Sequence, residues 1–135
     1  MANSLQRYFD LAESMALKSD SRFRLGAVLV RKRRIISAGF NQMRKTHPIM
    51  QSHAKDLGWT VGLHAEVHAC LGVAPRLLEG SDVYVVRIKA NGETAMAKPC
   101  SFCARFLSEV GIRAAHFTTS DGQGHSRIIY NGKIS

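Results

Sequence analysis

The chain has 135 residues, of which 45% are apolar and 21% charged, a balance typical of one globular domain with its own core. No apolar run approaches the roughly 18 residues of a membrane span, and the first residues do not resemble a secretory signal. The net charge of +9 favours anionic partners such as nucleotides or nucleic acid. We therefore expect a single cytoplasmic domain over residues 1–135 that does not bind membranes.

The first half of the chain predicts a helix followed by a hairpin. Apolar residues at helical spacing predict an amphipathic helix over residues 4–18. Two apolar runs then predict buried strands over residues 25–30 and 35–40, joined by a turn of four basic residues, Arg31–Arg34. This basic turn permits two interpretations, a phosphate or nucleic-acid patch and a solvated hairpin turn, and we favour the solvated turn.

A long polar segment over residues 41–63 follows the hairpin and carries His47, Pro48 and Gly58 as breakers of regular structure. Irregular stretches of this length inside a compact domain are usually functional or partly disordered. Trp59 lies in this segment, and its ring could stack on a base or pack in the core; we favour packing.

The second half alternates helix and strand signals. The predicted elements are a helix over residues 64–73, strands over 83–88 and 94–97, a helix over 100–110, and strands over 114–119 and 127–130. Asn91 and Gly92 mark a hairpin turn, Pro99 suits the start of a helix, and Gly111 suits its end. This order of elements predicts an α/β sandwich in which helices cover a mixed sheet.

Two short motifs, each at the start of a predicted helix, carry candidate chemistry. One is H-x-E, from His64 to Glu66, and the other is P-C-x-x-C, which contains Cys100 and Cys103. A catalytic zinc ion needs three protein ligands and one open position, and this set offers one imidazole and two thiolates. C-x-x-C spacing brings the sulfurs one helical turn apart, where the helix N-terminus lowers the thiol pKa. Together the motifs match the signature of zinc-dependent nucleobase deaminases.

Glu66 is the candidate catalytic residue. Side chains two positions apart do not share a helix face, so Glu66 is expected beside the attacking water while His64 binds the zinc. There a carboxyl group can accept a proton and return it to the leaving amine. The alternative is a closed structural zinc site, which needs a fourth ligand from His68, Cys70 or His116.

Over residues 25–121 the sequence resembles the cytidine and deoxycytidylate deaminase superfamily, through the zinc motifs and the strand end at Gly39–Asn41. The resemblance implies a three-layer α/β/α sandwich of the cytidine deaminase type with a central five-stranded mixed sheet. It implies that Asn41 binds the sugar or base of the substrate and that the Ala65 backbone N–H binds the base carbonyl. It also implies a homo-oligomer.

Histidine at position 64 resembles the deoxycytidylate, tRNA-adenosine and riboflavin branches, because the small cytidine deaminases carry a cysteine there. The short C-x-x-C argues against the riboflavin branch, and a hairpin over residues 87–98 argues against the tRNA-adenosine branch. This hairpin and Lys45–Pro48 resemble small phage and bacterial deaminases of the deoxycytidylate group. His47 is therefore a candidate ligand of a substrate phosphate, and a loop held by local hydrogen bonds is the alternative.

The sequence thus predicts a zinc-dependent hydrolytic deaminase of a free nucleotide, most simply of the cytosine in dCMP. One alternative is a deaminase of polynucleotides, acting on cytosine in single-stranded DNA or adenosine in tRNA, with nucleic acid as its partner. Another is a non-catalytic binding module stabilised by zinc. Glu66 argues against the module, because a structural zinc site has no use for this carboxyl group.

Overall fold

The computed structural model describes residues 4–58, 61–120 and 124–131, and a mixed β-sheet lies at its centre. The strands are β1 (Arg24–Arg31), β2 (Arg34–Phe40), β3 (Asp82–Ile88), β4 (Thr94–Ala95), β5 (Ala114–Thr118) and β6 (His125–Ile129). Within the described residues, five strands follow the order β2-β1-β3-β5-β6, and β4 pairs with β3 beside this path. β3 and β5 are parallel, whereas the other paired strands are antiparallel. The expected five-stranded mixed sheet is confirmed, with β4 as a short addition.

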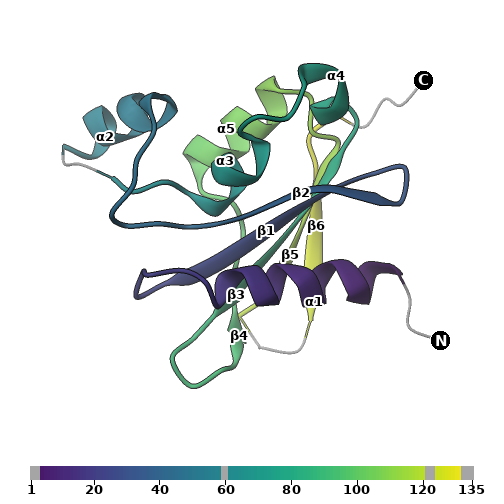
Figure 1. Cartoon of the computed structure of the whole chain (residues 1–135), viewed down its shortest axis with the longest axis horizontal. Coiled ribbons are helices and arrows are strands. Elements are labelled where there is room, and N and C mark those ends of the chain that lie inside the picture. Colours follow the sequence, from purple (N-terminus) through teal and green to yellow (C-terminus); the bar gives the residue numbers. More distant parts are fainter. Residues whose placement is uncertain (1–3, 59–60, 121–123, 132–135) are drawn as a thin grey trace.

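Helices cover both faces of the sheet (Figure 1). α1 (Ser4–Ala16) lies across one face, and α3 (Ala65–Cys70), α4 (Pro75–Leu78) and α5 (Ser101–Glu109) lie across the other. Val28 and Val86 pack beneath α1, whereas their chain neighbours Ala27 and Val85 belong to the core beneath α3 and α5. This division follows from the two-residue period of a strand and confirms the three layers. None of the described helices is long and apolar enough to cross a membrane.

At two glycines of the sheet, the backbone of a helix lies directly against the backbone of a strand. A Cβ atom at Gly26 of β1 would lie 1.9 Å from the backbone oxygen of Ala12 in α1. A Cβ atom at Gly39 of β2 would lie 2.6 Å from the backbone nitrogen of Ala69 in α3. Because α3 rests directly on the end of β2, the sheet fixes the position of the first turn of α3.

The connection between β2 and α3 contains two short helical elements, η1 (Pro48–Met50) and α2 (Gln51–Leu57). The expectation of irregular structure over residues 41–63 is therefore wrong for this part. α2 buries none of its residues, so it has no apolar periodicity that a sequence pattern could reveal. Gln42 and Leu63 close the base of the connection through two backbone hydrogen bonds of 2.9 Å.

Some element boundaries differ from the predicted ones. α1 ends at Ala16, α3 ends at Cys70, and β6 runs from His125 to Ile129, each a few residues from the expected limit. Such shifts are ordinary, because the ends of elements are set by capping and tertiary contacts. Trp59 lies outside the described residues.

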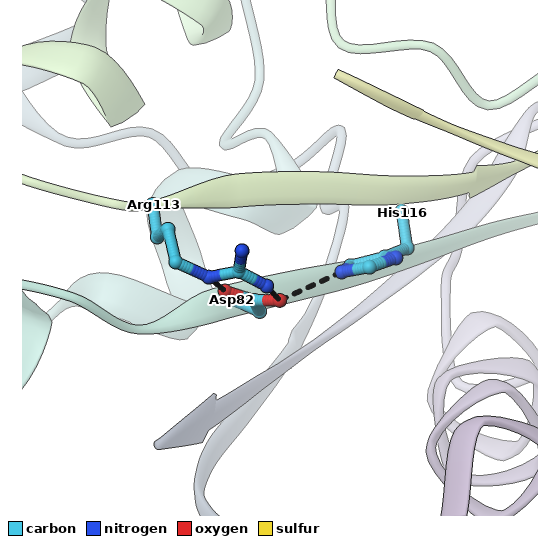
Figure 2. Close-up of polar contacts among 3 residues, drawn as sticks. All are labelled: Asp82, Arg113 and His116. Atoms are coloured by element: carbon cyan, nitrogen blue, oxygen red, sulfur yellow. Dashed lines mark hydrogen bonds and ion pairs between the residues drawn. The ribbon is translucent and has the colours of Figure 1, made fainter. Parts of the chain in front are cut away.

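A buried ionic cluster joins the two parallel strands (Figure 2). Asp82 of β3 accepts a hydrogen bond of 2.7 Å from Arg113 Nε, and His116 Nε2 of β5 lies 2.7 Å from its other carboxylate oxygen. The His116 ring also stacks on Tyr84, with centroids 4.3 Å apart. Burial alone would raise the pKa of Asp82, but the hydrogen bonds with His116 and Arg113 lower it below its ordinary value. The cluster therefore belongs to the framework of the sheet.

Candidate active site

α3 and α5 begin close together and bring the two sequence motifs into one place. His64 is the last extended residue before α3, and Cys100 has the same position before α5. Cys103 follows in the first turn of α5 and is fully buried. The Nδ1 atom of His64 lies 3.2 Å from Cys103 Sγ and 3.8 Å from Cys100 Sγ. The structure thus brings the three predicted metal ligands together.

These distances suit a zinc ion. Zinc binds imidazole nitrogen at about 2.0–2.1 Å and thiolate sulfur at about 2.3 Å in tetrahedral geometry, which separates nitrogen from sulfur by about 3.5 Å. The two observed separations, 3.2 and 3.8 Å, lie on either side of this value. Imidazole and thiolate are also the donors that zinc prefers. A single histidine with two cysteines leaves a fourth position for water or substrate.

The thiol pKa values of the two cysteines are shifted in opposite directions. A hydrogen bond from Cys103 lowers the pKa of Cys100 to about 3, burial opposes this, and His64 adds to the lowering. The hydrogen bond to Cys100 and burial raise the pKa of Cys103 well above its ordinary value. The expected lowering of the thiol pKa therefore holds for Cys100 alone, and its main cause is the neighbouring thiol. Metal binding at such a site must displace a proton from Cys103.

Glu66 lies in the first turn of α3 and is 5% exposed. Burial raises the pKa of its carboxyl group above the ordinary value. Glu66, His64 and Cys100 all line a cavity of about 370 Å³, a volume within the range of about 300–1,000 Å³ usual for small-molecule sites. The predicted catalytic carboxyl thus shares one cavity with two of the predicted metal ligands.

Two of the three residues expected to bind substrate line this cavity. Ala65 is buried at its wall. Asn41 also lines it, and its side-chain amide accepts a hydrogen bond from Leu25 N (2.9 Å) and donates one to Phe23 O (2.5 Å). Asn41 is therefore held rigidly against the start of β1 at the edge of the cavity.

His47 has a local role in the structure. Its Nδ1 accepts a hydrogen bond of 3.2 Å from Ile49 N and caps η1. It is not among the described residues that line the cavity. This arrangement matches the alternative of a loop held by local hydrogen bonds, and binding of a phosphate by His47 stays a prediction.

The residues considered as a fourth structural ligand are engaged elsewhere. The Nδ1 atom of His68 accepts a hydrogen bond of 3.0 Å from Phe40 N. Cys70 packs in the core, where burial raises the pKa of its thiol to about 12. His116 pairs with Asp82 on the other side of the sheet.

His53 is a site residue that no sequence pattern marks. It lies on α2, and one of its ring nitrogens is within 4.8 Å of the donor atoms of His64 and Cys100. Its ring stacks on Phe102 at 4.8 Å and meets the His64 ring edge-on at 5.2 Å. Because α2 has no apolar period, only the folded connection reveals that His53 approaches the metal ligands.

The basic turn lies at the far end of β1 and β2 from the cavity. Arg31 pairs with Arg34 at the turn, whereas Gly26 pairs with Phe40 near the cavity. Lys32 and Arg33 are exposed and adopt left-handed φ angles of 50° and 66°. The turn borders a wide groove of about 1,520 Å³, but the candidate metal ligands among the described residues lie at the other end of the sheet.

The family described as the cytidine and deoxycytidylate deaminase zinc-binding region matches residues 2–119. The chain belongs to this family. It is thus a zinc-type deaminase of the cytidine deaminase superfamily, and its cluster of His and Cys side chains agrees with that membership. It is similar to an uncharacterized deaminase in the luxG 3′ region of Aliivibrio fischeri, with 32% identity over 111 residues, which cover 79% of this chain and 67% of that protein.

Solved structures of other deaminases share the fold. The dCMP deaminase of cyanophage S-TIM5 has a TM-score of 0.61 at 20% identity, covering 91% of this chain and 90% of that one. The cytidine deaminase of Burkholderia pseudomallei has a TM-score of 0.64 at 18% identity, covering 96% and 94%. At such identities the likeness shows the cytidine deaminase fold alone. The substrate of this chain has to be inferred from its own residues.

Proposed function

We propose that this deaminase binds one zinc ion through His64, Cys100 and Cys103 and hydrolyses the cytosine of a free nucleotide such as dCMP. Water and cytosine would yield uracil and ammonia. The observation that carries the proposal is the buried carboxyl of Glu66 in the same cavity as His64 and Cys100. A purely structural zinc site would give no reason to bury a carboxyl group there, because burial of an unpaired charge is costly.

When bound, zinc acts as a Lewis acid that makes water a nucleophile near neutral pH. Glu66 would accept the proton of the water that attacks the ring carbon. It would pass this proton to the ring nitrogen, then accept the second proton from the same oxygen and donate it to the amine that leaves as ammonia. A raised pKa suits this double role, because a carboxyl group that titrates closer to neutrality both accepts and returns a proton readily.

The substrate would be oriented by the two wall residues. Ala65 is the first residue of α3, so its backbone N–H has no partner within the helix and is free to meet the base carbonyl. Asn41 already has a fixed orientation, and the second hydrogen of its side-chain amide could bind the sugar or base. Rigid groups of this kind hold a substrate without loss of their own freedom on binding.

Ammonia release by the zinc-loaded protein tests the proposal. The substrates are dCMP, CMP, deoxycytidine, cytidine, adenine and guanine nucleotides, and a single-stranded oligonucleotide that contains cytosine. We expect turnover of a free cytosine nucleotide. Turnover of the oligonucleotide alone would instead support the polynucleotide deaminase, which the net charge of +9 also favours. No turnover of any substrate by zinc-loaded protein would overturn the proposal.

A further inference from the structure

Arg87 brings a positive charge into the cavity. It is the sixth residue of β3, lies opposite Leu25 of β1, and lines the cavity together with His64 and Glu66. Neither zinc motif includes it. Its contribution to the cavity depends on the pairing of β3 with β1, which places the end of one strand beside the start of the other.

The Arg87 guanidinium has no ionic partner among the described residues. Its Nε atom is buried and makes no hydrogen bond. Arg113, by contrast, is paired with both carboxylate oxygens of Asp82. A partly buried cation without a partner is costly, so an anion that binds Arg87 would be strongly favoured.

The guanidinium of Arg87 lies over the ring of Phe23. The Cζ atom of Arg87 lies 4.7 Å from the centre of the Phe23 ring, and Phe23 is 54% exposed. An aromatic ring offers no oxygen to the guanidinium, so this contact leaves N–H donors available for the oxygens of a phosphate. The Arg87 guanidinium is therefore already placed beside Phe23 before an anion binds.

The charges around the cavity agree with an anionic ligand. Lys98 is a second cation in the lining, and Glu66 is the acidic residue among the described lining residues. We propose that Arg87, beside Phe23, binds the phosphate of the substrate and thereby selects a nucleotide over a nucleoside. This inference rests on the proposed function, and the phosphate could belong to a free nucleotide or to a polynucleotide.

The test removes the phosphate and the guanidinium separately and together. kcat/KM is measured for dCMP and deoxycytidine with the zinc-loaded wild type, Arg87→Gln and Arg87→Lys. Loss of a hydrogen-bonded charge pair predicts a fall of about 10-fold to 100-fold for dCMP with Arg87→Gln, mainly through KM, and a change below about 2-fold for deoxycytidine. Arg87→Lys keeps the positive charge but lacks the planar set of guanidinium N–H donors. Its kcat/KM for dCMP should therefore lie between the values for the wild type and Arg87→Gln.

Two further variants keep the test decisive. Arg105→Gln makes the same change in net charge at an exposed position of α5 outside the cavity, and both substrates should react as with the wild type. Phe23→Leu alters an exposed ring, so it should fold even if Arg87→Gln does not. It should weaken the reaction of dCMP by about 2-fold to 5-fold through loss of the cation–π contact. Equal losses for nucleotide and nucleoside would overturn the inference.

A separate binding measurement distinguishes failure of this inference from failure of the proposed function. Deoxyribose 5-phosphate contains no base, and its binding to the zinc-loaded wild type and Arg87→Gln can be followed by NMR. Weaker binding to Arg87→Gln, by about 10-fold or more, supports the inference even if no cytosine compound is deaminated. Equal binding to both proteins, or none to the wild type, overturns it. If an oligonucleotide binds as well, steep loss of its affinity with salt identifies the polymer as the source of the phosphate.

Discussion

Cys103 and His53 both approach the pair formed by His64 and Cys100, and zinc content distinguishes their roles. Cys103→Ala removes a sulfur atom 3.2 Å from His64 Nδ1, so we expect loss of stoichiometric zinc after dialysis against a chelator. His53→Ala removes a ring that stacks on Phe102, so we expect about one zinc ion per chain, with affinity reduced by no more than about 10-fold to 100-fold. Metal analysis with chelator competition provides both values.

The reverse result would change the ligand set. If His53→Ala lost zinc while Cys103→Ala retained it, the ion would be held by His53, His64 and Cys100, whose donor atoms lie within 4.8 Å of one another. Cys100→Ala serves as the common control, because Cys100 belongs to both sets and its removal should abolish stoichiometric zinc in either case.

The core of the site could be predicted from the sequence because its geometry is local. H-x-E and C-x-x-C each fit within one turn at the start of a helix, so residue spacing indicates which side chains converge within each motif, and the known deaminase signature indicates that the two motifs form one site. Arg87 could not be predicted, because its place in the cavity follows from the pairing of β3 with β1. His53 could not be predicted either, because the bridge between Gln42 and Leu63 folds its segment back.

At the scale of elements, the contact of α3 with β2 positions the catalytic turn. Gly39→Ala would place a Cβ atom 2.6 Å from Ala69 N, so α3 must shift and move His64 and Glu66 with it. We expect the free energy of unfolding to fall by about 1–3 kcal/mol, together with a clear loss of activity in the folded protein. Denaturant unfolding and ammonia release measure the two effects.

Gly26→Ala is the matched control on the opposite face. Its Cβ would lie 1.9 Å from Ala12 O, so it should destabilise the protein at least as much by displacing α1. Because α1 carries none of the site residues, the folded fraction should keep its zinc and most of its activity. Equal loss of activity in both variants would contradict the role assigned to α3.

The ionic cluster between β3 and β5 predicts a dependence of stability on pH. The folded-state pKa of Asp82 lies below its unfolded value of about 3.9, so its stabilising contribution is present above that pH. The contribution is lost as the pH falls through the folded-state pKa. Asp82→Asn should lower the free energy of unfolding by about 1–3 kcal/mol near pH 7. The difference from the wild type should shrink below about pH 4.

Denaturant unfolding between pH 3 and pH 7 measures this difference. A constant gap between wild type and Asp82→Asn over the whole range would contradict the lowered pKa of Asp82. Arg105→Gln, an exposed position on α5, should show no comparable dependence on pH.

Buried strands were predictable, and the exposed helix α2 was not. The apolar runs over residues 25–30 and 83–88 correspond to β1 and β3, because a strand covered on both faces is apolar along its whole length. α2 buries no residue, so it has no clear apolar pattern. β6 is mostly exposed, and its predicted strand over residues 127–130 overlaps the observed one but misses its first two residues.

For the molecule as a whole, the net charge is +9, and basic residues lie at both ends of the sheet. The exposed turn at Lys32 and Arg33 lies at one end, and Arg87 and Lys98 lie in the cavity at the other. A free nucleotide would need only the second group, whereas a polynucleotide could also use the first. The proposed preference for a free nucleotide therefore makes the basic turn dispensable for activity. Assembly into a homo-oligomer is a further proposal, which sedimentation of the zinc-loaded protein would test.

The most direct test of the central claim compares zinc-loaded wild type with Glu66→Gln. Removal of the carboxyl group without loss of volume should leave the zinc content at the wild-type level, because Glu66 is not among the proposed ligands. Ammonia release from the nucleotide substrate should fall by about 100-fold to 10,000-fold, the usual contribution of a general acid–base group. A Glu66→Gln protein that kept both its zinc and full activity would contradict the account.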